Sequence, residues 1–306
     1  MNSVDIYYEI LFLQQLQANP DQGSEKMVVE ETSVQAPSAE RQQEDIDHLI
    51  DWMSKEAHLP KVDDREWLLT VLHHNKYSLE KTKNKLENYF SYRNKYPEVL
   101  QNRDPSDKDI AQARMAFNTS SADRLTKDGG RVLFCRFSPD ASIFDIQNYL
   151  KYGAMVCDLS YLEHDRHEYC MSVTDLKDYT YMHFMKALPG IKTGVDIFFG
   201  ALSFRLRAIH VINCAPGLEK FLNIFKGFLP AKFAERFYVH SSTEELLKYV
   251  DEDVVCSDFG GKGPSLADYD SKFLLIFRFL IHISSPLWRA DVDRFPHEPQ
   301  IAWIYT

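Results

Sequence analysis

The sequence predicts an α/β protein in which a helical N-terminal module precedes a domain built on a largely parallel sheet. In the second half of the chain, short β-branched segments alternate with helical segments of roughly 10–20 residues, a pattern typical of parallel sheets. The chain has 306 residues, of which 44% are hydrophobic. This is enough apolar material for one large buried core and a smaller one beside it.

The N-terminal third of the chain predicts helices joined by a polar linker. Residues 5–18 have apolar side chains at helical spacing, whereas residues 19–40 are polar and indicate a disordered linker. Helical patterns resume at 44–59, 63–74 and 78–96, with Asp63 or Asp64 and then Ser78 as N-caps. We therefore expect residues 1–43 to form a helix plus an acidic linker, and residues 44–98 to form a small helical module.

Beyond the glycine turn at residues 128–130, strands and helices alternate. The sequence predicts strands at 132–137, 171–176, 207–213 and 237–240, and helices at 143–163, 181–203, 218–228 and 243–250. The segment 207–213 is β-branched and almost continuously apolar, which indicates a strand buried on both faces. We expect one domain over residues 110–265. In the divergent tail, 266–306, the apolar run 273–283 fits a packed helix, a membrane-touching helix or an altered exon.

Charge and cysteine content exclude several classes of protein. The net charge is −10, but the first 60 residues hold 12 of the 45 acidic residues and only 3 of the 35 basic ones. The body of the chain is therefore nearly neutral, and we expect no nucleic-acid partner. Five widely spaced cysteines predict neither a disulfide framework nor a zinc site. Without a leader pattern or an apolar run of roughly 20 residues, a soluble cytoplasmic protein is expected.

Motifs that resemble catalytic or metal sites favour structural roles here. His164, His167 and Cys170 are three residues apart and could bind zinc on a helix, but a strand is expected to begin at Cys170. The glycine-rich run 258–265 lacks phosphate-loop spacing and predicts a turn. No GxSxG motif marks a nucleophile, and Asp175 is either a polar pocket group or a carboxylate bound by neighbouring groups. We assign no catalytic residue, metal or cofactor.

Two features indicate a hydrophobic ligand near a membrane. Large apolar side chains are concentrated in residues 197–206 and in 218–229, where they cover more than one face of the predicted helix. Such a helix buries one side against an apolar surface and can meet a second hydrophobic phase on the other. A set of basic residues flanks this helix. Such a set is most often a solvated surface, although beside an exposed apolar helix it also suits contact with anionic lipids. The residues are Arg205, Arg207, Lys220, Lys226, Lys232 and Arg236.

Eight stretches in a fixed order give the chain a family resemblance. They are HLP (58–60), WLL (67–69), KYSLEKT (76–82), YRNKYPE (92–98), VTDLKDY (173–179), RLRAIHVIN (205–213), FKGFL (225–229) and FGGK (259–262). Over residues 44–265 the sequence resembles the CRAL-TRIO family, in particular its arthropod-type, tocopherol- and retinoid-carrier branch.

The resemblance implies a helical bundle packed on a mixed sheet, a deep apolar cavity and a helical gate near residues 213–236. The implied cavity lining is Leu150, Cys157, Val173, Ile197, Leu202, Phe204, Leu206 and Ile209. The implied gate residues are Phe221, Leu222, Phe225, Phe228 and Leu229. In the tocopherol-carrier branch a basic cleft binds phosphoinositide head groups, and it carries over to Arg205, Arg207, Lys232 and Arg236.

The chain departs from the family pattern in two places. The first module has Thr70, His73 and Asn75 where arginines are usual, which weakens a second basic contact. Residues 199–203 read FGALS where the family has a Gln-acid-aromatic-Pro segment, so the cavity wall differs.

The expected function is intracellular binding and transfer of a hydrophobic lipid, with phosphoinositide bisphosphate recognition during transient membrane contact. The alternative is a regulatory scaffold that reads phosphoinositides without moving cargo. A hydrolase or other enzyme has no supporting constellation of residues. The identity of the lipid, either tocopherol- or retinoid-like or a phospholipid, and the oligomeric state stay open.

Overall fold

The computed structural model describes residues 35–162 and 164–283. Five strands form one sheet in the order β1-β2-β3-β4-β5. Strands β2 (Gly130–Phe137), β3 (Tyr169–Asp175), β4 (Leu206–Ile212) and β5 (Phe237–Val239) run parallel, and β1 (Phe117–Ser121) pairs antiparallel with β2. The predicted α/β fold with a mixed sheet is confirmed.

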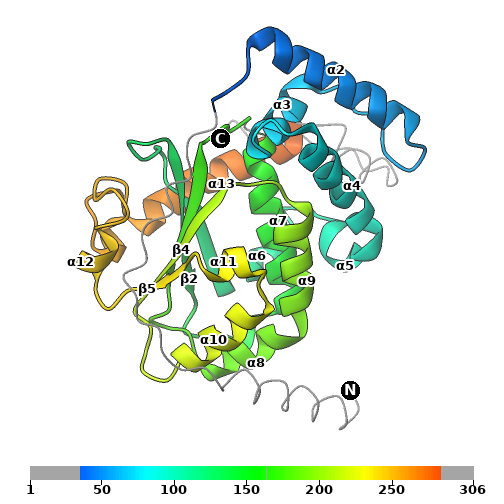
Figure 1. Ribbon diagram of the computed structural model, residues 1–306. Helices are drawn as coiled ribbons and strands as arrows, with labels where there is room; N and C mark the ends of the chain where they lie inside the picture. Colours follow the sequence, from blue (N-terminus) through cyan, green and yellow to red (C-terminus); the bar gives the residue numbers. More distant parts are fainter. Residues whose placement is uncertain (1–34, 163, 284–306) are drawn as a thin grey trace, which may run out of the picture.

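Helical crossovers join the parallel strands, as such strands require. Helix α7 (Ile146–Leu162) lies between β2 and β3 along the chain. Helices α8 (Tyr181–Ala187) and α9 (Ile191–Val195) follow β3, and α10 (Glu219–Phe228) and α11 (Ala231–Ala234) follow β4 (Figure 1). Beyond β5 come the short α12 (Thr243–Leu246) and the long α13 (Leu266–Ile283).

The sheet has one closely packed face, which we call the closed face. Successive side chains of a strand point to opposite faces. On the closed face, strands β2 to β4 contribute Val132, Phe134, Met171, Val173, Ala208 and Ile212. These side chains share one apolar cluster with α12, the segment 250–259 and the start of α13. This face and its cover form the core of the sheet domain.

The opposite face, which we call the open face, is packed less completely. Its side chains on the same strands include Leu133, Ser172, Thr174 and Ile209, all only half-buried. Helix α7 covers it at one edge, where Tyr149 lies 4.8 Å from the ring of Phe117 on β1.

Helix α10 reaches the open face at the other edge. The ring of Phe225 lies 6.0 Å from that of Phe237 on β5, and Phe237 is the strand neighbour of Ile209. The open face is therefore covered by helices at both edges, yet its side chains retain exposed surface.

The N-terminal module consists of α2 (Ala39–Lys55), α3 (Arg65–His74), α4 (Leu79–Lys95) and α5 (Pro97–Leu100), at the upper right of Figure 1. Asp64 and Ser78 cap α3 and α4 by accepting hydrogen bonds from the third residue on, as expected. The module core, around Trp67, is continuous with side chains of α7 and of residues 197–202. The module therefore packs on the sheet domain through one shared apolar cluster.

Three elements of the sheet domain, among them α11, are absent from the expectations, and one expected helix is divided. Helix α6 (Lys108–Ala116) and strand β1 precede the glycine turn. In place of one helix at 181–203, the structure has four consecutive segments. They are α8, a 3₁₀ turn containing Pro189, α9, and a π-helical segment, Asp196–Ala201. Proline removes a backbone donor and breaks a regular helix, which explains the division.

The start of the tail is a packed helix. Leu266 and Tyr269 of α13 join the closed-face cluster, and Phe273 packs against α6 and α7. Of the described helices, none is long and apolar enough to cross a membrane. The expected helix at 5–18, most of the linker and residues 284–306 lie outside the described residues.

Candidate functional site

The open face of the sheet is the strongest candidate for a ligand site. Ser172, Thr174 and Ile209 lie on β3 and β4, which have a strand on either side, yet all three keep part of their surface exposed. On α7 above them, Tyr149 and Cys157 also keep exposed surface. Burial nevertheless raises the pKa of both side chains, because protein surrounds them. Accessible surface that protein encloses indicates space between the sheet and its helical cover.

The predicted cavity residues divide into two groups around this space. Five lie in or against the apolar cluster shared with the N-terminal module: Leu150, Cys157, Ile197, Leu202 and Phe204. Of these, Cys157 and Phe204 retain exposed surface, whereas the other three are buried. Leu206 is buried at the start of β4, and Ile209 lies on the open face. These positions leave Cys157, Phe204 and Ile209 as the best candidates for lining residues.

Val173 is the exception among the predicted cavity residues. It pairs with Phe134 on β2 and with His210 on β4, and its side chain belongs to the closed-face cluster. Because neighbouring residues of a strand face opposite ways, Ser172 and Thr174 occupy the open face in its place. The assignment of Val173 to the pocket is therefore corrected: it is a core residue beneath the other face.

The predicted gate is helix α10, which is held loosely. None of its residues is buried, and the side chain of Phe228 is 41% exposed. Phe221 contacts Phe184 on α8 with 4.6 Å between ring centroids. Leu222 is half-buried, and Leu229 just beyond the helix is buried. A helix with so little buried surface can move away from the sheet at a small cost in free energy.

A buried carboxylate holds the chain where β4 leads into the gate. Asp175 accepts hydrogen bonds from Asn213 Nδ2 (2.8 Å), from the Lys177 amide (3.0 Å) and from Arg136 Nε (2.9 Å). Asn213 itself has a left-handed backbone with φ of 54°. The structure therefore supports the interpretation of Asp175 as a carboxylate bound by its neighbours, one of which, Asn213, begins the segment that leads to α10.

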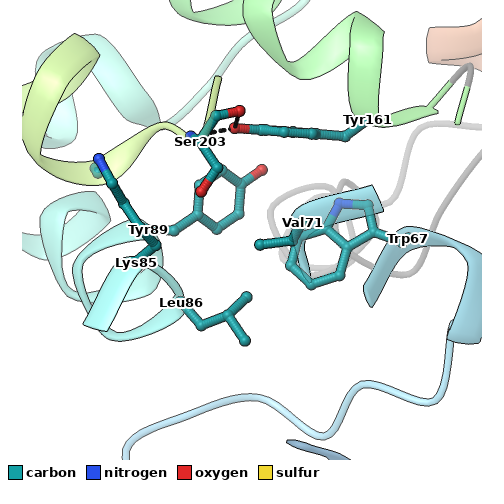
Figure 2. A pocket seen from close by; sticks show the side chains of 8 residues that line it. Trp67, Val71, Lys85, Leu86, Tyr89, Tyr161 and Ser203 are labelled. Carbon is teal, nitrogen blue, oxygen red and sulfur yellow. Dashed lines mark hydrogen bonds between the residues drawn. The ribbon is translucent and has the colours of Figure 1, made fainter. Parts of the chain in front are cut away.

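A separate small cavity lies between the module and the sheet domain. Figure 2 shows Trp67, Val71 and Leu86 around it, with the hydroxyl of Tyr161 bonded to Ser203 (2.7 Å). Its volume is about 10 Å³. A cavity of this size holds about one water molecule, so it offers no room for a lipid.

Arg205 is not available as a head-group ligand in this conformation. Its side chain is 5% exposed. It donates to the main-chain oxygen of His73 and lies 3.2 Å from a carboxylate oxygen of Glu168. The predicted partner Arg207 is more exposed, but it forms a 2.6 Å ion pair with Asp128. Both arginines that the sequence places in one cleft therefore have protein partners.

The other two residues of the predicted head-group cleft, Lys232 and Arg236, lie in α11 and just beyond it. Lys232 is exposed, and Lys232 and Arg236 lie on the ring of Phe233 at 4.7 and 5.9 Å. Lys85 of α4 was not predicted; its ammonium donates to the carbonyls of Phe199 (2.8 Å) and Leu202 (2.9 Å). Burial, and then the charge of Lys232, lowers the pKa of Lys85 to about 8. Its role depends on a contact more than a hundred residues away, which no local pattern signals.

The motifs considered for metals and phosphates have structural positions. His164 lies beyond α7 with a left-handed backbone, Cys170 lies on β3, and the ring of His167 packs 4.8 Å from that of His74. Within residues 35–162 and 164–283, no group of three or more metal-ligating side chains converges. Gly260 has a φ of 84°, which confirms the predicted glycine turn.

Comparisons with known proteins agree with this architecture. A family model described as CRAL/TRIO domain matches residues 93–261, and one described as Pinta-like, UBA domain matches residues 38–110. Proteins described as alpha-tocopherol transfer protein-like from Homo sapiens, Pongo abelii and Mus musculus are 27% identical to this chain over 232 residues. The match covers 72% of this chain and 66% of each relative, just under two thirds of its length.

A solved structure gives the same result at the level of the fold. The crystal structure of Sfh5 matches 82% of this chain and 100% of its own, with a TM-score of 0.51 and 13% identity.

Proposed function

Because this chain belongs to the CRAL/TRIO domain family, whose members bind or transfer lipids, we propose that it carries one hydrophobic molecule beneath the gate helix α10. The observation that carries the proposal is the partly exposed open face of two inner strands under a helical cover. A solid core would leave Ser172, Thr174 and Ile209 fully buried, as their closed-face neighbours are. An apolar ligand would fill this space and complete the core.

The hydrophobic effect is large enough to hold such a ligand. Removing apolar surface from water contributes about 25 cal/mol per Å², so several hundred Å² of a lipid correspond to tight binding. Release requires α10 to move, and a membrane lowers that cost because the exposed side of the helix then meets hydrocarbon. The half-exposed gate residues Phe221, Leu222, Phe225 and Phe228 supply this apolar side.

Membrane recognition is the finer part of the proposal. We assign phosphoinositide contact to Lys232 in α11, to Arg236 just beyond it, and to Arg207 near the start of β4. Arginine binds phosphate through its planar fork, and Arg207 could exchange its exposed partner Asp128 for a phosphate. Arg205 is left out of the assignment because its guanidinium is buried. The protein would work in the cytoplasm and contact membranes transiently.

The test is the identity and stoichiometry of a co-purifying molecule. The full chain is expressed in lipid-rich cells, examined by native mass spectrometry and extracted with organic solvent. One apolar molecule per chain is expected, with a tocopherol-like compound as a natural first candidate given the names of the relatives. A persistently empty chain that still binds vesicles containing phosphatidylinositol bisphosphate would support the alternative, a phosphoinositide-reading scaffold without cargo.

A further inference from the structure

The open face carries a row of neutral polar groups in the middle of its apolar surroundings. Thr119 Oγ1 on β1 lies 3.9 Å from Cys135 Sγ on β2, which in turn lies 3.9 Å from Ser172 Oγ on β3. Ser172 Oγ and Thr174 Oγ1 are 3.2 Å apart. The row therefore crosses three adjacent strands on the side that the proposed ligand occupies.

These hydroxyls have unused hydrogen-bonding capacity. Each Ser or Thr hydroxyl has one donor and two acceptor lone pairs. Ser172 and Thr174 share one bond with each other, and the thiol of Cys135 is only a weak partner. Above them, the Tyr149 hydroxyl has no hydrogen bond to any residue that the structure describes. Groups of this kind are costly to bury unless a ligand or water completes their bonding.

The polar groups around this row are uncharged at neutral pH. Burial raises the pKa of the Cys135 and Cys157 thiols and of the Tyr149 and Tyr179 hydroxyls, so all four keep their protons. The strand positions between them are apolar or bear hydroxyls.

Arg131 of β2 shares this face by alternation, but it lies at the start of the strand and pairs with Asp165 at 2.8 Å. Two further cations approach the face, and each already donates to a main-chain carbonyl. Lys226 on α10 donates to the oxygen of Phe237 at 3.4 Å, and Arg236 donates to that of Leu206. Neither is placed in the hydroxyl row. A carboxylate or phosphate at Ser172 would therefore lose its hydration without gaining a counter-charge.

We infer that the ligand has a neutral hydrogen-bonding head group, an alcohol, aldehyde, ketone or ester, and that Ser172 and Thr174 hold this group on the open face. The inference rests on the proposed function. It restricts the ligand to neutral-headed apolar molecules and excludes phospholipids and free fatty acids as the preferred cargo. Ser172 and Thr174 then determine specificity, while the apolar lining supplies most of the affinity.

A matched pair of fluorescent probes tests the inference. The full chain is titrated at pH 8 with cis-parinaric acid, which is ionised, and with the corresponding alcohol, which has the same chain. The alcohol is expected to bind about tenfold or more tightly than the acid, because only the acid must shed its charge hydration. The variant S172A/T174V is expected to lose about three- to tenfold in affinity for the alcohol and to leave that for the acid unchanged.

Controls separate the possible outcomes. Ser54→Ala, on the exposed side of α2, should leave both affinities unchanged, and circular dichroism shows whether S172A/T174V is folded. Equal affinities for the alcohol and the acid would overturn the inference. So would tighter binding of the acid, if the variant Lys226→Met abolishes that preference. In both cases the carrier function stands. An alcohol affinity unchanged in folded S172A/T174V would also overturn it. If neither probe binds and the purified chain is empty, the carrier function itself fails.

Discussion

Arg205 donates to the main-chain oxygen of His73. A guanidinium from the residue before β4 therefore caps a carbonyl in the last turn of helix α3, in the N-terminal module. Glu168, at 3.2 Å, balances its charge from the side of the sheet domain. Its geometry is that of a buried link between two parts of the molecule. The two arginines of the RLRAIHVIN stretch therefore differ in kind: Arg205 joins the module to the sheet, and Arg207 faces solvent in part.

Replacing Arg205 should weaken the fold more than it weakens membrane binding. In Arg205→Ala the carbonyl of His73 loses a charged donor, and we expect the free energy of unfolding to fall by about 2 kcal/mol. Urea unfolding measures this loss. Arg207→Ala is the control, with a loss below about 1 kcal/mol because its ion pair with Asp128 is largely exposed. An Arg205→Ala protein with unchanged stability but no vesicle binding would restore the head-group assignment.

The buried pair of Arg103 and Asp158 gives a second stability prediction. Both side chains are 2% exposed, their atoms are 2.7 Å apart, and Asp158 also accepts a bond from the Tyr89 hydroxyl. Arg103→Met leaves a buried charge without its partner and should cost about 3 kcal/mol of unfolding free energy. The double variant R103M/D158L should lose less than the sum of the two single variants. Additive losses in this double-mutant cycle would show that the pair does not interact.

The order of elements could be predicted from sequence because it depends on local signals. The caps Asp64 and Ser78 and the glycine turn before β2 are encoded within a few residues of where they act. Strand β1 could not be found in this way. Its sequence, FNTSS, has little β-branched or alternating character, and it is a strand because it pairs with β2, whose residues follow it by more than ten positions.

The site was harder to predict, because tertiary packing decides which face of the sheet a ligand could reach. Alternation shows that Ser172 and Val173 point to opposite faces, but it does not show which face the helices cover loosely. The resemblance placed Val173 in the pocket, whereas the structure places Val173 in the closed-face cluster and Ser172 and Thr174 on the open face. Likewise, the partner that buries Arg205 is His73, in another part of the chain, so no window around Arg205 contains the signal.

Acid should destabilise the protein through its buried histidines. Burial, followed by the charges of His167 and His73, lowers the pKa of His74 well below its usual 6.5. Burial, and then His240, lowers the pKa of His210 to about 3. Both are neutral in the folded state, whereas the unfolded chain binds protons as the pH falls below about 6.5. Their stabilisation is therefore complete above that pH and decreases below it.

For His210, whose pKa in the folded state is about 3, the expected loss between pH 7.5 and pH 5 is about 2 kcal/mol, from 1.36 kcal/mol per pH unit below 6.5. His74 adds a loss of the same sign. Urea unfolding at pH 7.5, 6.5, 5.5 and 5 measures the slope. His210→Asn should reduce the slope by about one proton, whereas His48→Asn, an exposed position, should not change it. Stability that stays constant down to pH 5 would contradict the buried neutral state.

Asp175 should control how fast the gate opens. It bonds Asn213, whose left-handed backbone begins the segment leading to α10, and it pairs with Arg136 at 2.9 Å. Asp175→Asn removes the charge that holds Arg136 and weakens the hinge contact. Since the gate must move for a ligand to leave, we expect release of parinaryl alcohol to vesicles to become about tenfold faster, equivalent to about 1.4 kcal/mol in the barrier.

Stopped-flow fluorescence measures this release rate, and Asp178→Asn, three residues further along, is the matched control. The equilibrium affinity should change less than the rate, because the hydroxyl row and the apolar lining are untouched. Release that is as slow in Asp175→Asn as in the unmodified protein would mean that the hinge contact does not limit opening. The bond between Asp175 and Asn213 would then stabilise the sheet edge alone, and the opening barrier would have to come from the contacts of Phe221 with Phe184 and of Phe225 with Phe237.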